Sequence, residues 1–263
     1  MRVARILLAG SLLAASGHAL AADMDILDAP EIAIVTPNTG FYLRADVAYG
    51  FDASFGGTQR LSRFGSTITD RTRGWDLDGG FGAGAGIGYK ASDLLRFDAT
   101  IDYWRRDVEA ANGAGWFCGF GPACGARDRG EIEAVELMGN AYLDLGTFAG
   151  FTPYVGGGVG AVHVSYSDVT GAATCPGGLT ACPALGAGAR YGGEDSWRFA
   201  YALSAGVSYD VTEKIAIDTG YRYLNVQDGD AYRFEPAAGT LLASDDDGFD
   251  RHTIRAGLRF RFD

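Results

Sequence analysis

Apolar and polar residues alternate one by one through eight segments of this chain. In the first segment, Phe41, Leu43 and Tyr49 occupy odd positions, and Arg44 and Asp46 occupy even ones. A helix cannot sort such residues onto two faces, whereas a strand places successive side chains on opposite faces. The alternation therefore predicts β-strands over residues 41–49, 80–89, 95–103, 135–144, 154–164, 199–209, 215–223 and 254–262.

The connections between these strands alternate between long and short. Long polar connections, beginning with 51–74, are separated by short ones at 90–93, 146–152 and 211–214. The apolar faces are rich in aromatic residues, since the chain contains 13 Tyr and 15 Phe. Barrels of the outer membrane have short periplasmic turns, long extracellular loops and aromatic girdles. The sequence thus predicts an all-β fold, a transmembrane, antiparallel, up-and-down β-barrel of about eight strands.

A soluble β-sandwich is the alternative fold, because its strands also alternate apolar and polar residues. A sandwich has no reason to surround its apolar face with Tyr and Phe. Nor has it a reason to place Arg and Asp on the opposite face of most strands. The pattern therefore favours the barrel over soluble sheets.

The N-terminus has the order of a secretory signal peptide. Arg2 and Arg5 precede an apolar stretch at 6–13, and small residues follow as far as Ala21. Because the apolar stretch is too short to span a bilayer as a helix, we expect cleavage after Ala21. The predicted organisation is a signal peptide at 1–21, a periplasmic N-terminal leader at 22–38 and an outer-membrane β-barrel at 39–263.

The chain is acidic, with 22 basic and 33 acidic residues and a net charge of −11. Cleavage after Ala21 leaves 20 basic residues against the same 33 acidic ones, a net charge of −13. Nucleic acid is therefore not expected as a partner, because it requires a basic face.

The four cysteines form two local pairs, Cys118 with Cys124 and Cys175 with Cys182. In an exported chain they favour disulfides. Three connectivities are formally open, and pairing within each loop is preferred. A zinc site formed by these cysteines is less favoured than disulfides, because neither spacing is C-x-x-C.

The even positions of the predicted strands direct charged side chains into the barrel. At about eight strands the interior is just wide enough for side chains to fill it, and an unpaired charge there is costly. We therefore expect a salt-bridged network that plugs the lumen, with inward glycines on the second and fifth strands leaving room for arginines. A narrow water path lined by the same charges is the alternative. The expected lumen network consists of Arg44, Asp46, Arg96, Asp98, Asp102, Glu136, Asp144, Asp218, Arg222, Arg255, Arg259 and Arg261.

Three segments, 152–161 (TPYVGGGVGA), 220–224 (GYRYL) and 257–262 (GLRFRF), carry a family resemblance. The chain resembles the eight-stranded, porin-like outer-membrane barrels of the opacity-type and outer-membrane immunogenic proteins, over about Gly40 to Asp263. The resemblance implies a surface-exposed barrel linked to envelope integrity, adhesion, immune recognition or, in some members, a narrow pore. It also implies that barrel-insertion machinery reads the C-terminus, where the family usually ends on an aromatic residue and this chain ends on Asp263.

One cluster of residues offers a candidate for catalysis. By strand parity His163 and Ser165 face outward near the rim, and a turn centred near 148–149 would place Glu133 across from His163. A serine, a histidine and a carboxylate can act as nucleophile, base and orienting group. The arrangement resembles the H-x-S motif of outer-membrane lipid A deacylases, which carry it late in the barrel. A polar cross-strand pair at headgroup level is the preferred interpretation.

Two further patterns are judged structural. Residues 156–161 match G-x-G-x-x-A, yet they lack the helix and the later acidic residue of a dinucleotide site. Asp245, Asp246, Asp247 and Asp250 could hold Ca²⁺, but their spacing does not fit an EF-hand, and a solvated acidic tip is preferred. No cofactor and no resident metal are expected.

The sequence as a whole predicts a non-enzymatic protein of the Gram-negative outer membrane, with both termini periplasmic. Its expected role is structural, in envelope integrity, and in surface interaction as an adhesin or antigen. A narrow diffusion channel is the alternative, and a lipid A-modifying hydrolase is a remote one. The expected partners are outer-membrane lipid and lipopolysaccharide, the barrel-insertion machinery, and host or cell-surface ligands bound by the loops.

Overall fold

The computed structural model describes residues 39–112, 125–174, 189–237 and 240–262. Eight antiparallel strands in it close into a barrel in which each strand pairs with its neighbours in this set. The described residues contain no helix that could span a membrane. The barrel strands are β1 (Gly40–Gly50), β4 (Gly80–Lys90), β5 (Leu95–Asn112), β6 (Gly125–Asp144), β7 (Phe151–Tyr166), β10 (Asp195–Asp210), β11 (Ile215–Val226) and β14 (Phe249–Arg261).

The predicted strands are confirmed, and several are longer than the alternation indicated. On β1, Phe41, Leu43 and Tyr49 lie on the exposed outer face, and Tyr42 and Asp46 are buried inside. Aromatic rings gather at two levels of the outer surface, as predicted for membrane girdles. Phe151 and Tyr209 meet near the short turns with ring centroids 4.7 Å apart, and Tyr49 and Phe81 meet near the opposite end at 5.1 Å.

Short turns connect the strands at one end, and two of them share a hydroxyl motif. The Ser92 hydroxyl accepts a hydrogen bond from the backbone N–H of Leu95 at 3.1 Å, and Thr212 does the same for Ile215 at 3.0 Å. Such local side-chain bonds favour turns over continued strands. These turns thus bring each strand directly back to its neighbour.

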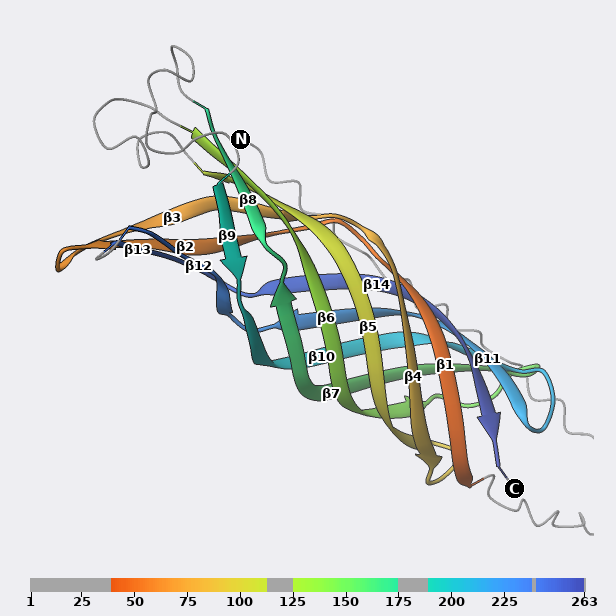
Figure 1. Cartoon of the computed structure of the whole chain (residues 1–263). Coiled ribbons are helices and arrows are strands. Elements are labelled where there is room, and N and C mark those ends of the chain that lie inside the picture. Colours follow the sequence, from red (N-terminus) through yellow and green to blue (C-terminus); the bar gives the residue numbers. More distant parts are fainter. Residues whose placement is uncertain (1–38, 113–124, 175–188, 238–239, 263) are drawn as a thin grey trace, which may run out of the picture. The chain divides into compact units, whose positions relative to one another are not determined.

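At the other end, two connections predicted as loops are instead folded into hairpins. Residues predicted as a polar loop at 51–74 form β2 (Ala53–Arg63) and β3 (Ser66–Leu77), and the acidic connection forms β12 (Gly229–Ala237) and β13 (Thr240–Asp246). Two shorter strands, β8 (Val169–Thr174) and β9 (Ala189–Gly193), join them. Figure 1 shows the hairpins projecting beyond the barrel, away from the C-terminus.

We call this projecting part the collar. It consists of β2, β3, β8, β9, β12 and β13 together with the ends of β5 and β6 beyond Trp104 and Ala134. Within the described residues the collar strands pair in the order β5-β6-β8-β9-β12-β13-β2-β3, and β3 returns to β5. The collar is therefore a second ring of strands that shares β5 and β6 with the barrel.

The pattern of polar and apolar faces inverts where barrel and collar meet. On the barrel part of β5, Phe97 and Ile101 face outward and Asp98 faces inward. Beyond Trp104 the charged Arg105 faces outward, and Val108 is buried inside. A strand in lipid must be apolar outside, and a strand in water must be apolar inside. The inversion therefore marks the level at which the barrel leaves the hydrocarbon.

Candidate functional site

The centre of the lumen is organised around Glu136 of β6, whose side chain is fully buried. Its carboxylate accepts hydrogen bonds from Trp104 Nε1 at 2.6 Å, Arg222 Nη1 at 2.7 Å and Arg251 Nη1 at 3.0 Å. Hydrogen bonds between ionised groups are about twice as strong as neutral ones, and they offset the cost of burying the charges. Glu136 therefore ties strands β5, β6, β11 and β14 together across the barrel.

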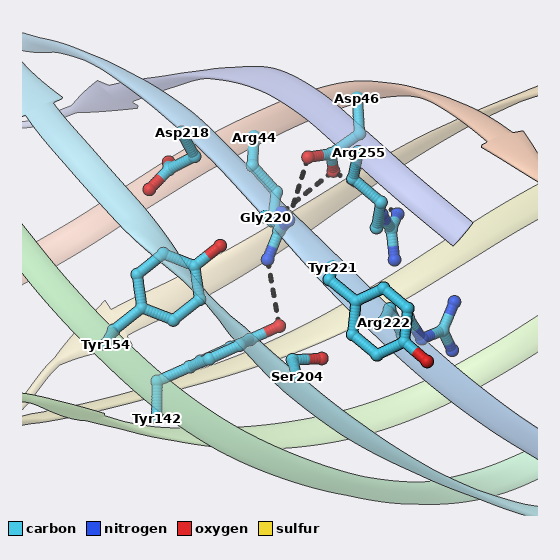
Figure 2. Close-up of a pocket in the computed structure, with 10 residues that line it drawn as sticks. All are labelled: Arg44, Asp46, Tyr142, Tyr154, Ser204, Asp218, Gly220, Tyr221, Arg222 and Arg255. Carbon is cyan, nitrogen blue, oxygen red and sulfur yellow. Dashed lines mark hydrogen bonds and ion pairs between the residues drawn. The ribbon is translucent and has the colours of Figure 1, made fainter. Parts of the chain in front are cut away.

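A second group of charges lies next to Glu136. Arg255 contacts Asp102 and lies 3.6 Å from Asp46, and Arg44 pairs with Asp46 at 2.8 Å and with Asp98 at 2.7 Å. Figure 2 shows Arg44 and Arg255 around a small cavity at this level. The carboxylates thus alternate with guanidinium groups at this level, so each charge of this group has an opposite charge beside it.

Nearer the short turns, the arginines also stack on aromatic rings. Arg96 pairs with Asp144 at 2.8 Å, and its guanidinium lies 5.0 Å from the ring centre of Tyr142 and 5.1 Å from that of Tyr154. A cation over an aromatic face gains energy most when water is excluded. Two further pairs, Arg259 with Asp218 at 3.3 Å and Arg261 with Asp210, complete the network at this end.

The structure thus places all twelve residues of the expected network on ion-paired lumen positions. The inward glycines of β4 and β7 make room for several kinds of side chain, and the arginine expected there is only one of them: Gly86 lies beside Arg44, whereas Gly84 lies beside Asp102 and Gly88 and Gly156 lie beside tyrosines. A Cβ on Gly88 would lie 2.2 Å from the Tyr42 ring, and one on Gly156 would lie 2.4 Å from the Tyr142 ring.

Three buried arginines were not predicted, because the strands that carry them are longer than the alternation indicated: Arg106 lies on β5 beyond residue 103. Arg251 lies on β14 ahead of residue 254, and Arg198 lies on β10 ahead of residue 199. Arg198 pairs with Asp246 at 2.7 Å, and Tyr166 donates a hydrogen bond to the same carboxylate at 2.7 Å. Burial raises the pKa of the Asp246 carboxyl, and the charge of Arg198 opposes that shift.

Above the charged lumen, the collar encloses an aromatic core. Trp75 stacks on Phe55 with centroids 6.1 Å apart, Phe55 meets Phe249 at 5.6 Å, and Phe249 meets Trp104 at 6.0 Å. Valine, isoleucine and alanine side chains from seven strands fill the space around these rings. The chain of rings thus runs from the collar to Trp104, which bonds Glu136 at the top of the charged network.

The candidate catalytic cluster is not assembled as predicted. The register places Glu133 opposite Ser165 and Val135 opposite His163, so the predicted pairing of Glu133 with His163 is wrong by two residues. His163 Nε2 instead lies 3.1 Å from a carboxylate oxygen of Asp195, and Glu133 lies 3.5 Å from Arg105. Ser165 and His163 both lie on the outer face, as parity indicated.

The remaining sequence patterns divide into those with a structural role and those outside the described residues. Residues 156–161 lie in the middle of β7, where no helix follows them. Asp245 pairs with Arg60, and Asp250 accepts hydrogen bonds from Tyr223 and Asn225. Within the described ranges no three His, Cys, Asp or Glu residues form a metal-binding group. The signal peptide, the leader and Cys118, Cys124, Cys175 and Cys182 lie outside the described residues.

The sequence matches the family described as "Outer membrane protein beta-barrel domain" over residues 7–262. The chain therefore belongs to this family of outer-membrane β-barrel proteins, which confirms the family that the resemblance indicated.

Similar proteins are found at moderate to low sequence identity. An uncharacterised protein of Brucella suis biovar 1 (strain 1330) is 35% identical over 251 residues, which cover 85% of each chain. Outer membrane protein PagN of Salmonella typhimurium (strain LT2) is 28% identical over 180 residues, which cover 67% of this chain and 68% of PagN. The crystal structure of OprG from Pseudomonas aeruginosa matches 86% of this chain and 98% of its own, at 17% identity and a TM-score of 0.49.

Proposed function

We propose that this protein is a non-conducting outer-membrane scaffold that maintains the envelope and presents the collar as a surface for interaction. The observation that carries the proposal is the filled interior. The predicted lumen charges are ion-paired, and the aromatic core of the collar lies above them. Water and ions would have to break several buried ion pairs to pass, and each broken pair costs several kcal/mol, on the order of 3–5 kcal/mol.

The collar supports the interaction part of the proposal. It is built from the long connections, which face the extracellular side in barrels of this kind, so both termini would be periplasmic. Its own core makes it a folded surface rather than a set of free loops. Host or cell-surface molecules are the proposed ligands of its outer face, and lipopolysaccharide and outer-membrane lipid surround the apolar band below.

The outer wall supports a non-enzymatic role. His163 bonds Asp195 and also packs on Trp197 with ring centroids 5.0 Å apart. No hydrogen bond joins His163 to Ser165 within the described part of the chain. A polar pair at headgroup level accounts for these contacts, since amphipathic rings favour the membrane interface.

Single-channel recording tests the closed lumen. Residues 22–263 would be refolded and added to a planar bilayer, and a heat-dependent shift in gel mobility would confirm that the barrel is folded. A silent membrane is expected from the folded protein. Discrete, reproducible openings would overturn the plugged scaffold and favour the narrow diffusion channel.

A complementation experiment tests the scaffold and surface roles separately. A strain lacking the protein would receive either the native chain or a chain with residues 56–72 replaced by a short Gly-Asn turn. The native chain should restore resistance to detergent and binding to host cells. The shortened chain should restore resistance alone, because it keeps the barrel and loses the β2–β3 hairpin. Equal binding by both chains would contradict the surface role.

A further inference from the structure

Two buried arginines meet where the barrel joins the collar. Arg251 of β14 bonds Glu136, and its guanidinium lies 4.4 Å from the ring centre of Trp104. Arg106 of β5 donates only to the backbone oxygen of its neighbour Arg105. Both side chains are inward and more than nine-tenths buried, at 4% and 8% exposure. Among the described residues no acidic side chain pairs with Arg106.

The wall behind them brings the two guanidinium groups together. Gly50 of β1 and Gly80 of β4 are direct cross-strand partners. A Cβ on Gly50 would lie 3.0 Å from Arg251 Nη2, and one on Gly80 would lie 3.0 Å from Arg106 Cζ. Directly opposite residues have Cβ positions about 4.5–5.5 Å apart. The two cations therefore lie over neighbouring glycines of one wall.

Each guanidinium also has an unused donor at this place. The Nη2 atoms of Arg106 and Arg251 are buried and have no hydrogen-bond partner in the described part of the chain. A small cavity adjoins Arg251 on the side away from Arg106, and Thr253, Arg222, Arg255 and the carboxylate-bearing Asp102 also line it. Two adjacent buried cations with free donors repel each other and are costly unless an anion lies between them.

We propose that this junction binds a small oxyanion, a phosphate, sulfate or carboxylate group, between Arg106 and Arg251. The planar guanidinium fork matches the geometry of such groups, and two forks can share one anion. The site faces the lumen side of the wall, so the group is a free anion rather than the phosphate of a lipid. Bound there, the anion would neutralise the junction between the charged lumen and the aromatic core.

Anion-dependent thermal stability tests the site. The refolded protein in a nonionic detergent would be melted in sodium phosphate or sodium sulfate, and in sodium chloride of equal ionic strength. A ligand that binds only the folded state raises its melting temperature with concentration. We expect a saturable rise in oxyanion beyond that in chloride. Arg106→Gln should lose the rise, and Arg105→Gln, an exposed neighbour paired with Glu131, should keep it.

Calorimetric titration of phosphate into the folded wild-type protein gives a second readout that needs no variant. A saturable single-site heat is expected, and its absence would overturn the site. The proposal would also fall if Arg106→Gln kept the full phosphate-dependent rise. Lipopolysaccharide added in place of phosphate distinguishes a lipid phosphate from a free anion. Stabilisation by lipopolysaccharide but not by phosphate would contradict the proposal that the ligand is a free anion.

Discussion

The barrel and the collar are made from partly the same strands, yet their interiors are opposite in chemistry. The barrel encloses arginines and carboxylates, of which Arg222 and Glu136 are almost completely buried. The collar encloses tryptophan, phenylalanine and valine, of which Trp75 is completely buried. Their outer faces are reversed in the same way, from Phe97 and Ile101 to Arg105.

The difference shows that the surrounding solvent decides which side of a strand can be polar. In lipid the outer face must be apolar, so polar groups go inside and must pair with each other. In water the hydrophobic effect drives apolar side chains inward. β5 satisfies both conditions along its 18 residues, because its two faces exchange roles at Tyr103 and Trp104.

The largest expected loss of stability comes from removing the central carboxylate of the barrel. Glu136→Ala leaves Arg222 and Arg251 buried without their acceptor, which should cost about 3–5 kcal/mol of unfolding free energy. Urea unfolding of the refolded protein in micelles measures this loss. Glu133→Ala is the matched control on the same strand, because its side chain is exposed and its loss should cost at most about 1 kcal/mol. Equal losses would contradict a paired lumen.

A loss of similar size, but limited to the collar, is expected from Trp75→Ala. Emptying this position leaves a cavity beside Phe55, which should cost about 3–5 kcal/mol. Because Trp75 belongs to the collar core, the variant should be cleaved by trypsin within β2 and β3 while the barrel keeps its heat-dependent gel shift. A variant that lost the gel shift would show that collar and barrel fold as one unit.

A charge on the outer wall should have opposite consequences in the two regions. Ala85→Arg lies midway along β4 on the lipid face, where an arginine should cost about 2–4 kcal/mol. Thr58→Arg lies on the outer face of the collar, in water and opposite Asp245, and should change stability by no more than about 0.5 kcal/mol. Refolding yield into lipid vesicles and urea unfolding would compare the two. Equal losses of stability in the two variants would contradict the conclusion that β4 at Ala85 faces lipid and β2 at Thr58 faces water.

The smallest effect is expected from an ion pair on the collar surface. Arg60 lies 2.6 Å from Asp245, but its side chain is 52% exposed. Arg60→Ala should therefore cost only about 0.2–1 kcal/mol, far less than breaking a lumen pair of the same chemistry. Raising the salt concentration should reduce this difference further, because exposed pairs are screened. A double-mutant cycle with Asp245→Ala would measure it.

Most of the barrel could be predicted from the sequence, because its alternation is strict where one face meets lipid. The eight strands and their inward sets follow from period two alone. The collar could not be predicted in this way. Its hairpin 53–77 mixes Gly, Thr, Ser and charged residues on both faces, and a bulge between Phe55 and Gly57 breaks the period. Pairing with distant strands, which no local pattern reveals, holds it in place.

The partners of the charged residues were harder to predict than their positions. Parity directs Glu136 inward, but only the closed ring brings it to Arg222 and Arg251, 86 and 115 residues away. Arg251 itself was missed because Phe249, at the start of β14, packs inside against Phe55 and Trp104 and does not belong to the lipid-facing pattern. The predicted pairing of Glu133 with His163 was wrong for a simpler reason. A small error in the position of the turn shifts every cross-strand pair between β6 and β7.

The exchange of faces on β5 also constrains the register in which this strand can pair with its neighbours. If β5 slid by one residue against β6, Arg96 and Asp98 would turn toward hydrocarbon while Trp104 and Val108 turned toward water. In a strand that lies wholly in lipid, such a slip would expose wrong side chains to one medium only. In β5 it would expose polar side chains to lipid and apolar side chains to water. The inversion therefore raises the free-energy cost of a one-residue slip in strand pairing, because such a slip places the wrong side chains in both media.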